Sequence, residues 1–177
     1  MKAVAFSVRP FEKEYLAKAN QKKHDITLIS NPLGVETAVY AEGKNAVIVF
    51  DDDDLSAPVI ERLAALGIKF IVTRSGNTSR IDKAAALAHG IKIASIPTSI
   101  LKAAANRDAG PGYINNANYN TIPQSLNEAG LSRETLQEIA DQTIKSLDLW
   151  SLNKCVGQAC ACANDCTKTL TAKNTQH

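Results

Sequence analysis

The sequence has no long apolar run and no excess of charge of one sign. None of its hydrophobic stretches approaches the roughly 20 residues that a membrane-spanning helix needs, so we expect no membrane partner. Its 20 basic and 18 acidic residues give a formal net charge of +2 and form no basic block. Because nucleic-acid binding calls for a concentrated basic surface, the charge pattern does not favour DNA or RNA.

A secretion signal is also missing from the start of the sequence, because Arg9, Glu12 and Lys13 interrupt the apolar residues too early. We therefore expect a cytoplasmic protein. The 177 residues, of which 45% are hydrophobic and 21% charged, have the composition of a globular chain with one core.

Short β-branched runs alternate with amphipathic helical patterns through the first hundred residues. Because parallel strands need crossover helices of this length, the alternation predicts an α/β fold, a flavodoxin-like parallel five-stranded sheet with flanking helices. The expected strands are residues 2–8, 26–30, 47–50, 69–73 and 91–96, and the expected helices are residues 10–19, 35–41, 56–66 and 82–89.

The rest of the chain divides into three parts. Residues 103–127 hold six asparagines, two glycines and two prolines without a helical or strand period, so residues 102–130 are predicted to be a linker. Residues 131–152 carry an apolar stripe at helical spacing behind a possible N-cap, Ser132. We expect this helix to pack back on the α/β unit of residues 1–101, and residues 153–177 to form a cysteine-rich tail whose removal leaves the core intact.

Several motifs of the α/β unit resemble the D-isomer-specific 2-hydroxyacid dehydrogenases, closest to the D-lactate dehydrogenase branch. The matching pieces are the strand V-I-V-F at residues 47–50, the loop R-S-G-N-T-S-R-I-D at residues 74–82, and Ile96-Pro97. In that family a nicotinamide-binding domain with a G-x-G-x-x-G loop follows. Here only Gly110-Pro111-Gly112 brings two glycines close together, and proline lacks the N–H that a phosphate needs.

The resemblance therefore implies a truncated relative that keeps the substrate domain and lacks the NAD domain. We expect no NAD binding and no dehydrogenase activity from this chain alone. The family's acid/base histidine also has no counterpart, because Asn127-Glu128-Ala129 stands where the family has H-x-A, and an amide does not titrate at neutral pH.

The same resemblance indicates a substrate-binding loop. Ser75, Gly76 and Asn77 match the loop whose backbone N–H groups hold a carboxylate in the family, although the order Gly76-Asn77-Thr78 departs from the family's A/V-G-F/V. Arg74 and Arg80 flank this loop as charges for an organic acid, and Thr98 stands near the substrate position. The alternative is structural: Arg74 pairs with a nearby carboxylate, and Asn77 shapes the turn.

Two clusters of side chains invite a metal interpretation. Asp51 to Asp54 follow a strand, but consecutive aspartates point in different directions, and helix capping by Asp54 or Ser56 explains them more simply. The tail holds C-x4-C-x-C-x3-C, which suits Zn²⁺, Cu⁺ or an iron–sulfur cluster; the alternative is a flexible tail with disulfides. The four thiols are those of Cys155, Cys160, Cys162 and Cys166, and the three histidines, His24, His89 and His177, are expected at the surface.

Three functional hypotheses follow. The first is a non-catalytic module, an oxidoreductase homologue that binds a small organic acid or regulates another protein. The second is a thiol-based metal or redox protein that uses the cysteine tail. The third is an oxidoreductase whose activity is completed by a partner chain, and a homodimer is a further possible assembly.

Overall fold

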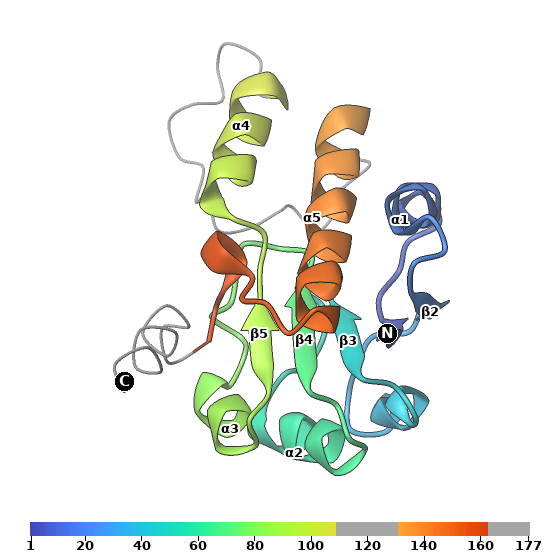
Figure 1. Cartoon of the computed structure of the whole chain (residues 1–177), viewed down its shortest axis with the longest axis vertical. Helices are drawn as coiled ribbons and strands as arrows, with labels where there is room; N and C mark the ends of the chain where they lie inside the picture. The colour runs from blue at the N-terminus through green and yellow to red at the C-terminus, as the bar shows by residue number, and fades with distance from the viewer. Residues whose placement is uncertain (109–130, 163–177) are drawn as a thin grey trace, which may run out of the picture.

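Five parallel strands form a single sheet in the order β2-β1-β3-β4-β5 (Figure 1). The structure is a computed structural model that describes residues 1–108 and 131–162. The strands are β1 (Lys2–Ala5), β2 (Asp25–Leu28), β3 (Ala46–Val49), β4 (Phe70–Thr73) and β5 (Lys92–Ala94). All neighbouring strands pair in parallel, which confirms the predicted fold class.

Helices cover both faces of this sheet. They are α1 (Glu12–Asn20), the 3-10 helix η1 (Thr37–Ala41), α2 (Ala57–Ala65), α3 (Lys83–Ala88) and α5 (Arg133–Ser151). Alternate strand residues point to opposite faces: Val47 and Val49 pack with η1, α2 and α3, whereas Ala46 and Ile48 pack with α1 and α5. The predicted packing of the last helix on the sheet is therefore confirmed, with Ile144 and Leu147 in the core.

The side chains of Ser132 and Asp82 cap two of the helices, and the cap at Ser132 is the one that the sequence predicted. The Ser132 side chain accepts a hydrogen bond from the Thr135 N–H, as expected, and Asp82 accepts one from Ala85. At α2, Ser56 holds the N-cap position without a side-chain hydrogen bond. Asp54 instead accepts from the Ser56 N–H at 2.9 Å, so it orders the residue before the helix.

The first part of the predicted linker is helical. Helix α4 (Thr98–Asp108) follows β5 directly, in a stretch rich in the good helix formers alanine, leucine and lysine. Leu101 and Ala104 are buried, and Leu101 joins Ile139 of α5 in a small apolar cluster. The composition of residues 103–127 concealed this helix, because the prolines and most of the asparagines of that stretch come after residue 108, where the helix ends. The rest of the linker, with Asn127, lies outside the described residues.

The chain beyond α5 belongs to the core. Val156 and Ala159 are 6% and 1% exposed and pack in the same cluster as Trp150. The Ser95 N–H donates to the Ala159 carbonyl at 2.8 Å, and the Ala161 N–H donates to the Ile93 carbonyl at 3.0 Å. Residues 156–162, which we call the edge strap, thus cover the outer edge of β5, whose backbone groups need partners. The expectation that the core does not depend on residues after Leu152 is wrong.

A charge placed in the edge strap tests its contribution to stability. We expect Ala159→Asp to lower the free energy of unfolding by about 3 kcal/mol, because a buried carboxylate without a partner is costly. Gln158→Asp adds the same charge at an exposed neighbour and should change stability by less than about 0.5 kcal/mol. Urea unfolding of both variants measures the difference, and equal losses would contradict the buried position of Ala159.

Candidate functional site

The candidate site lies where the carboxyl ends of the strands meet. Ligands of open parallel sheets bind at this edge, in the crevice beyond the strand ends. Here it gathers polar side chains that follow β1, β3 and β4, and those that are buried are Ser7, Asp51, Asp53, Arg74 and Ser75. Their internal contacts decide which groups remain available to a ligand.

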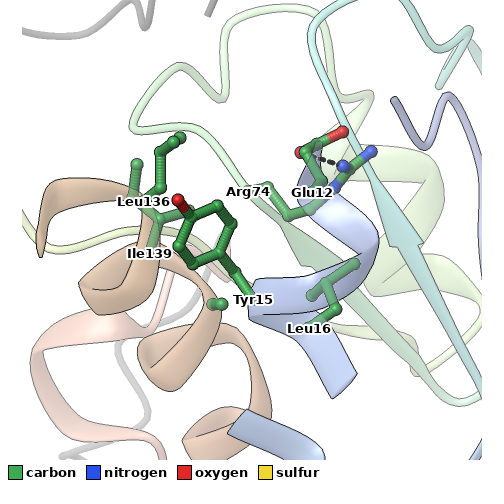
Figure 2. Close-up of a pocket in the computed structure, with 7 residues that line it drawn as sticks. Glu12, Tyr15, Leu16, Arg74, Leu136 and Ile139 are labelled. Carbon is green, nitrogen blue, oxygen red and sulfur yellow. Dashed lines mark hydrogen bonds and ion pairs between the residues drawn. The ribbon is translucent and has the colours of Figure 1, made fainter. Parts of the chain in front are cut away.

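Arg74 points into the interior. Its side chain is 2% exposed, and its Nη1 forms an ion pair with the Glu12 carboxylate of α1 (Figure 2). Its Nη2 donates to the carbonyls of Phe6 at 2.6 Å and Ser7 at 3.3 Å, and its guanidinium lies 5.4 Å from the centre of the Phe50 ring. The structure thus shows the internal ion pair, the alternative interpretation of Arg74, and leaves no charge of this residue for an organic acid.

A small cavity lies beside this ion pair, between α1 and α5. It has a volume of about 20 Å³, and Tyr15, Arg74 and Ile139 are among its lining residues (Figure 2). The buried Arg74 Nε has no hydrogen-bond partner among the described residues. A cavity of this size accommodates a single water molecule, so it is too small for an organic acid.

The loop after β4 is held by its own side chains. The Ser75 N–H donates to Thr73 Oγ1 at 3.1 Å, and the Asn77 N–H donates to Ser75 Oγ at 3.0 Å. Asn77 Oδ1 accepts from both the N–H and the hydroxyl of Ser79, at 3.0 and 2.7 Å. Asn77 therefore shapes the turn, as the structural alternative proposed.

Two backbone donors of this loop remain available. Within the described parts of the chain, the N–H groups of Gly76 and Thr78 donate no hydrogen bond. Both residues are half-buried. The loop is fixed to the neighbouring strand end, because the Ile96 N–H donates to the Ser75 carbonyl at 3.1 Å. Thr98, two residues further on, is exposed at the first turn of α4, so it lies at the same edge of the sheet.

Asp51 connects this loop with Arg80. Its Oδ2 accepts from Ser75 Oγ at 3.2 Å, and its backbone carbonyl accepts from Arg80 Nη1 at 2.7 Å. Burial raises the pKa of Asp51, and the hydrogen bond from Ser75 offsets this only in part. Sequence reasoning did not single out Asp51 for the loop, because the contact joins residues 24 positions apart.

Asp53 has a structural role. Its Oδ1 accepts from Ser7 Oγ at 2.8 Å and from the Leu33 N–H at 2.6 Å, and its Oδ2 accepts from the Phe50 N–H at 2.6 Å. The carboxylate thus ties together the ends of β1 and β3 and the turn at Leu33. The four aspartates point to different partners, and no group of three or more histidine, cysteine or acidic side chains in the described residues could hold a metal ion.

The thiol of Cys162 contacts the sheet, whereas the thiol of Cys155, just before the edge strap, contacts its own turn. Cys162 Sγ accepts from the Ile93 N–H at 3.3 Å, and the Gly157 N–H donates to Cys155 Sγ at 3.5 Å. Cys160 pairs with Ala94 in an antiparallel bridge. Cys166 lies outside the described residues, so the four-thiol site stays a prediction.

His24 is not at the surface, contrary to expectation. It is 7% exposed, and its Nε2 lies 2.9 Å from Asp148 Oδ1 of α5. This contact holds the start of β2 against the end of α5. His89 is exposed, as expected, and His177 lies outside the described residues.

Comparison with known proteins defines the family. The pattern of the D-isomer specific 2-hydroxyacid dehydrogenase catalytic domain matches residues 3–160. D-lactate dehydrogenase of Escherichia coli is 30% identical over 137 residues, which are 77% of this chain and 42% of that protein. A D-lactate dehydrogenase of Curvularia clavata is 36% identical over 103 residues, 55% of this chain and 30% of that protein.

A solved structure agrees with these relatives. The apo form of E. coli D-lactate dehydrogenase superposes with a TM-score of 0.54 at 30% identity, covering 60% of this chain and 35% of that one. The chain therefore belongs to the D-isomer specific 2-hydroxyacid dehydrogenase family, which confirms the resemblance seen in its motifs. It spans less than half the length of these relatives. No helix in the described residues is long and apolar enough to cross a membrane.

The three acceptor contacts of Asp53 predict a loss of stability in Asp53→Asn. An asparagine turns an N–H₂ group towards at least one of the three donors, so we expect the free energy of unfolding to fall by about 1–3 kcal/mol. Asp52→Asn is the matched control, because Asp52 is exposed and, among the described residues, pairs only with Arg9 at 3.4 Å, a contact of about 0–1 kcal/mol. Urea unfolding at pH 7 compares the two variants.

The loss of stability in Asp53→Asn relative to the wild type should also depend on pH. Burial raises the pKa of Asp53 above the ordinary value of 3.8, so between 3.8 and the raised value the native state binds more protons than the unfolded state. The contribution of Asp53 to stability therefore falls as pH rises through this window, and Asp53→Asn loses that dependence. The penalty of the substitution should shrink from low to neutral pH; a penalty that grows instead would contradict the raised pKa.

Proposed function

We propose that this chain binds the carboxylate of a small 2-hydroxy or 2-oxo acid on the loop of residues 75–78, as a binding or regulatory module. The observation that carries this proposal is the pair of available N–H donors at Gly76 and Thr78, in a loop whose other two backbone N–H groups, those of Ser75 and Asn77, are already paired. Carboxylates bind well to backbone N–H groups that are fixed in advance, because little ordering entropy is lost on binding.

The position of the loop supports the same function. It lies at the carboxyl edge of a parallel sheet, the usual ligand side of such folds, and the family relatives include D-lactate dehydrogenases. The half-buried setting of Gly76 and Thr78 strengthens hydrogen bonds to an anion relative to fully exposed donors. The proposal needs no charge from Arg74, which is committed to Glu12.

The loop supplies groups that bind an organic acid, and it supplies none that transfer a hydride. A dehydrogenase reaction needs a nicotinamide and a group that exchanges the hydroxyl proton, whereas backbone N–H donors only hold and orient the acid. We therefore propose a use of the bound acid as a signal or as cargo. A second candidate follows from membership of the dehydrogenase family: a partner chain that carries the nicotinamide would complete an oxidoreductase site at this edge.

The two candidates differ in their response to a nucleotide. If the chain is a binding module, D-lactate should shift the backbone amide resonances of Gly76 and Thr78 in the absence of any nucleotide. If a partner completes the site, NADH oxidation with pyruvate should appear only when that partner is added. If these resonances do not shift with D-lactate up to about 50 mM, a concentration at which even very weak binding is detected, the proposed function is refuted.

Removal of one backbone donor tests the loop directly. Gly76→Pro eliminates the N–H, so we expect D-lactate affinity to fall by about tenfold, the value of one hydrogen bond to a charged group. Gly76→Ala keeps the N–H and should bind within about threefold of the wild type. Calorimetric titration measures both, and melting temperatures establish that each variant remains folded. Equal affinities in the two variants would contradict a role for this N–H.

The carboxyl of Asp51 gives the binding a pH dependence. As pH rises through the raised pKa of Asp51, a negative charge forms next to Ser75 and repels an anionic ligand, so wild-type affinity should decline. Asp51→Asn keeps an acceptor for the Ser75 hydroxyl and removes the charge. We expect this variant to bind D-lactate about threefold more tightly at pH 7, with little pH dependence. Titrations between pH 5 and pH 8 would refute this if the variant bound more weakly.

A further inference from the structure

The three arginines at the carboxyl edge of the sheet differ in how their charge is compensated. Arg74 is paired with Glu12, and Arg9 lies 3.4 Å from Asp52. Arg80 forms no ion pair within 4.0 Å among the described residues, and its one hydrogen bond goes to a neutral group, the Asp51 carbonyl. Its side chain is exposed, so it presents a positive charge at this edge.

Arg80 is nevertheless held in place. The Ile81 N–H donates to the Thr78 carbonyl at 3.2 Å, and the Asp82 N–H donates to the Leu55 carbonyl at 3.0 Å, which fixes the backbone on either side of the arginine side chain. The bond from Nη1 to Asp51 at 2.7 Å then orients the guanidinium. No described residue accepts from Nε or Nη2. These two nitrogens form one edge of the planar guanidinium, which suits bidentate binding of a carboxylate.

Asp51 also brings this guanidinium close to the loop of residues 75–78. The side chain of Asp51 accepts from Ser75, and its carbonyl accepts from Arg80, so one residue contacts both the loop and the arginine. An acid bound to the Gly76 and Thr78 N–H groups would therefore have a fixed cation within reach of its other end.

We propose that Arg80 makes this site selective for acids with a second carboxylate, that is, for 2-hydroxy or 2-oxo dicarboxylates. The inference rests on the proposed function, because the first carboxylate occupies the loop. A second carboxylate gains two charge-assisted hydrogen bonds from Nε and Nη2, whereas the methyl group of lactate gains none. Selectivity arises from this difference, since both acids make the same contacts with the loop.

The experiment compares D-malate with D-lactate by calorimetric titration of the whole chain at low ionic strength. We expect the wild type to bind D-malate about tenfold more tightly than D-lactate, because one additional charge-assisted contact raises affinity by about that factor. Arg80→Gln should abolish this preference by lowering D-malate affinity about tenfold, while D-lactate affinity falls by no more than about threefold. Arg62→Gln, an exposed arginine of α2, is the matched control for loss of one positive charge and should keep the preference.

Ionic strength provides a second readout. Because Arg80 is exposed, its attraction for the second carboxylate is screened by salt, so the preference of the wild type for D-malate should shrink as salt is added. Arg80→Gln, which is expected to have no preference, should bind the two acids equally at every salt concentration. Equal affinities of the wild type for the two acids would overturn the role of Arg80 and leave the proposed function standing. Binding of neither acid would overturn both, and a preference that survives in Arg80→Gln would overturn the role of Arg80 alone.

Discussion

The buried pairing of Arg74 with Glu12 is the interaction on which the arrangement of this edge depends. A charge in the interior is tolerated only when it is paired and its remaining hydrogen-bonding groups are satisfied. Arg74 is paired with Glu12 of α1, and its Nη2 donates to the carbonyls of Phe6 and Ser7. Its guanidinium also lies over the face of Phe50, while its Nε faces the small cavity without a partner among the described residues. One side chain thus joins the ends of β1, β3 and β4 to the first helix. The loop that follows Arg74 is consequently built on a rigid base.

Aspartates complete this base in two different ways. Both carboxylate oxygens of Asp53 accept hydrogen bonds from the strand ends and from Leu33, so Asp53 maintains the shape of the edge. Asp51 contacts Ser75 and Arg80 and lies between the loop and its flanking cation. Burial raises the pKa of both carboxyl groups, yet their partners differ. For that reason one is best understood as structural, and the other as an influence on the proposed binding of an acid.

The lateral edge of the sheet at β5 shows how the end of the described chain contributes to the fold. Strand β5 has a neighbour on one side in β4, and its other side would expose unpaired backbone groups. The edge strap covers it with main-chain hydrogen bonds and with the Cys162 thiol, while Val156 and Ala159 fill the space beside Trp150, which itself stacks on Phe70 at 4.7 Å. The cysteine-containing segment is thereby part of the same packing unit as α5.

The sequence by itself determined the parallel α/β architecture, the family, the cap at Ser132 and the turn at Asn77, because periodicity and local hydrogen bonding act between near neighbours. Only the tertiary structure decided that Arg74 points inward, that His24 is buried and that the edge strap belongs to the core. These outcomes depend on partners far away along the chain: Arg74 and Glu12 are 62 positions apart, and His24 and Asp148 are 124 apart. A motif fixes where such a residue stands in the chain, but the partner that folding brings to it fixes what its charge can do.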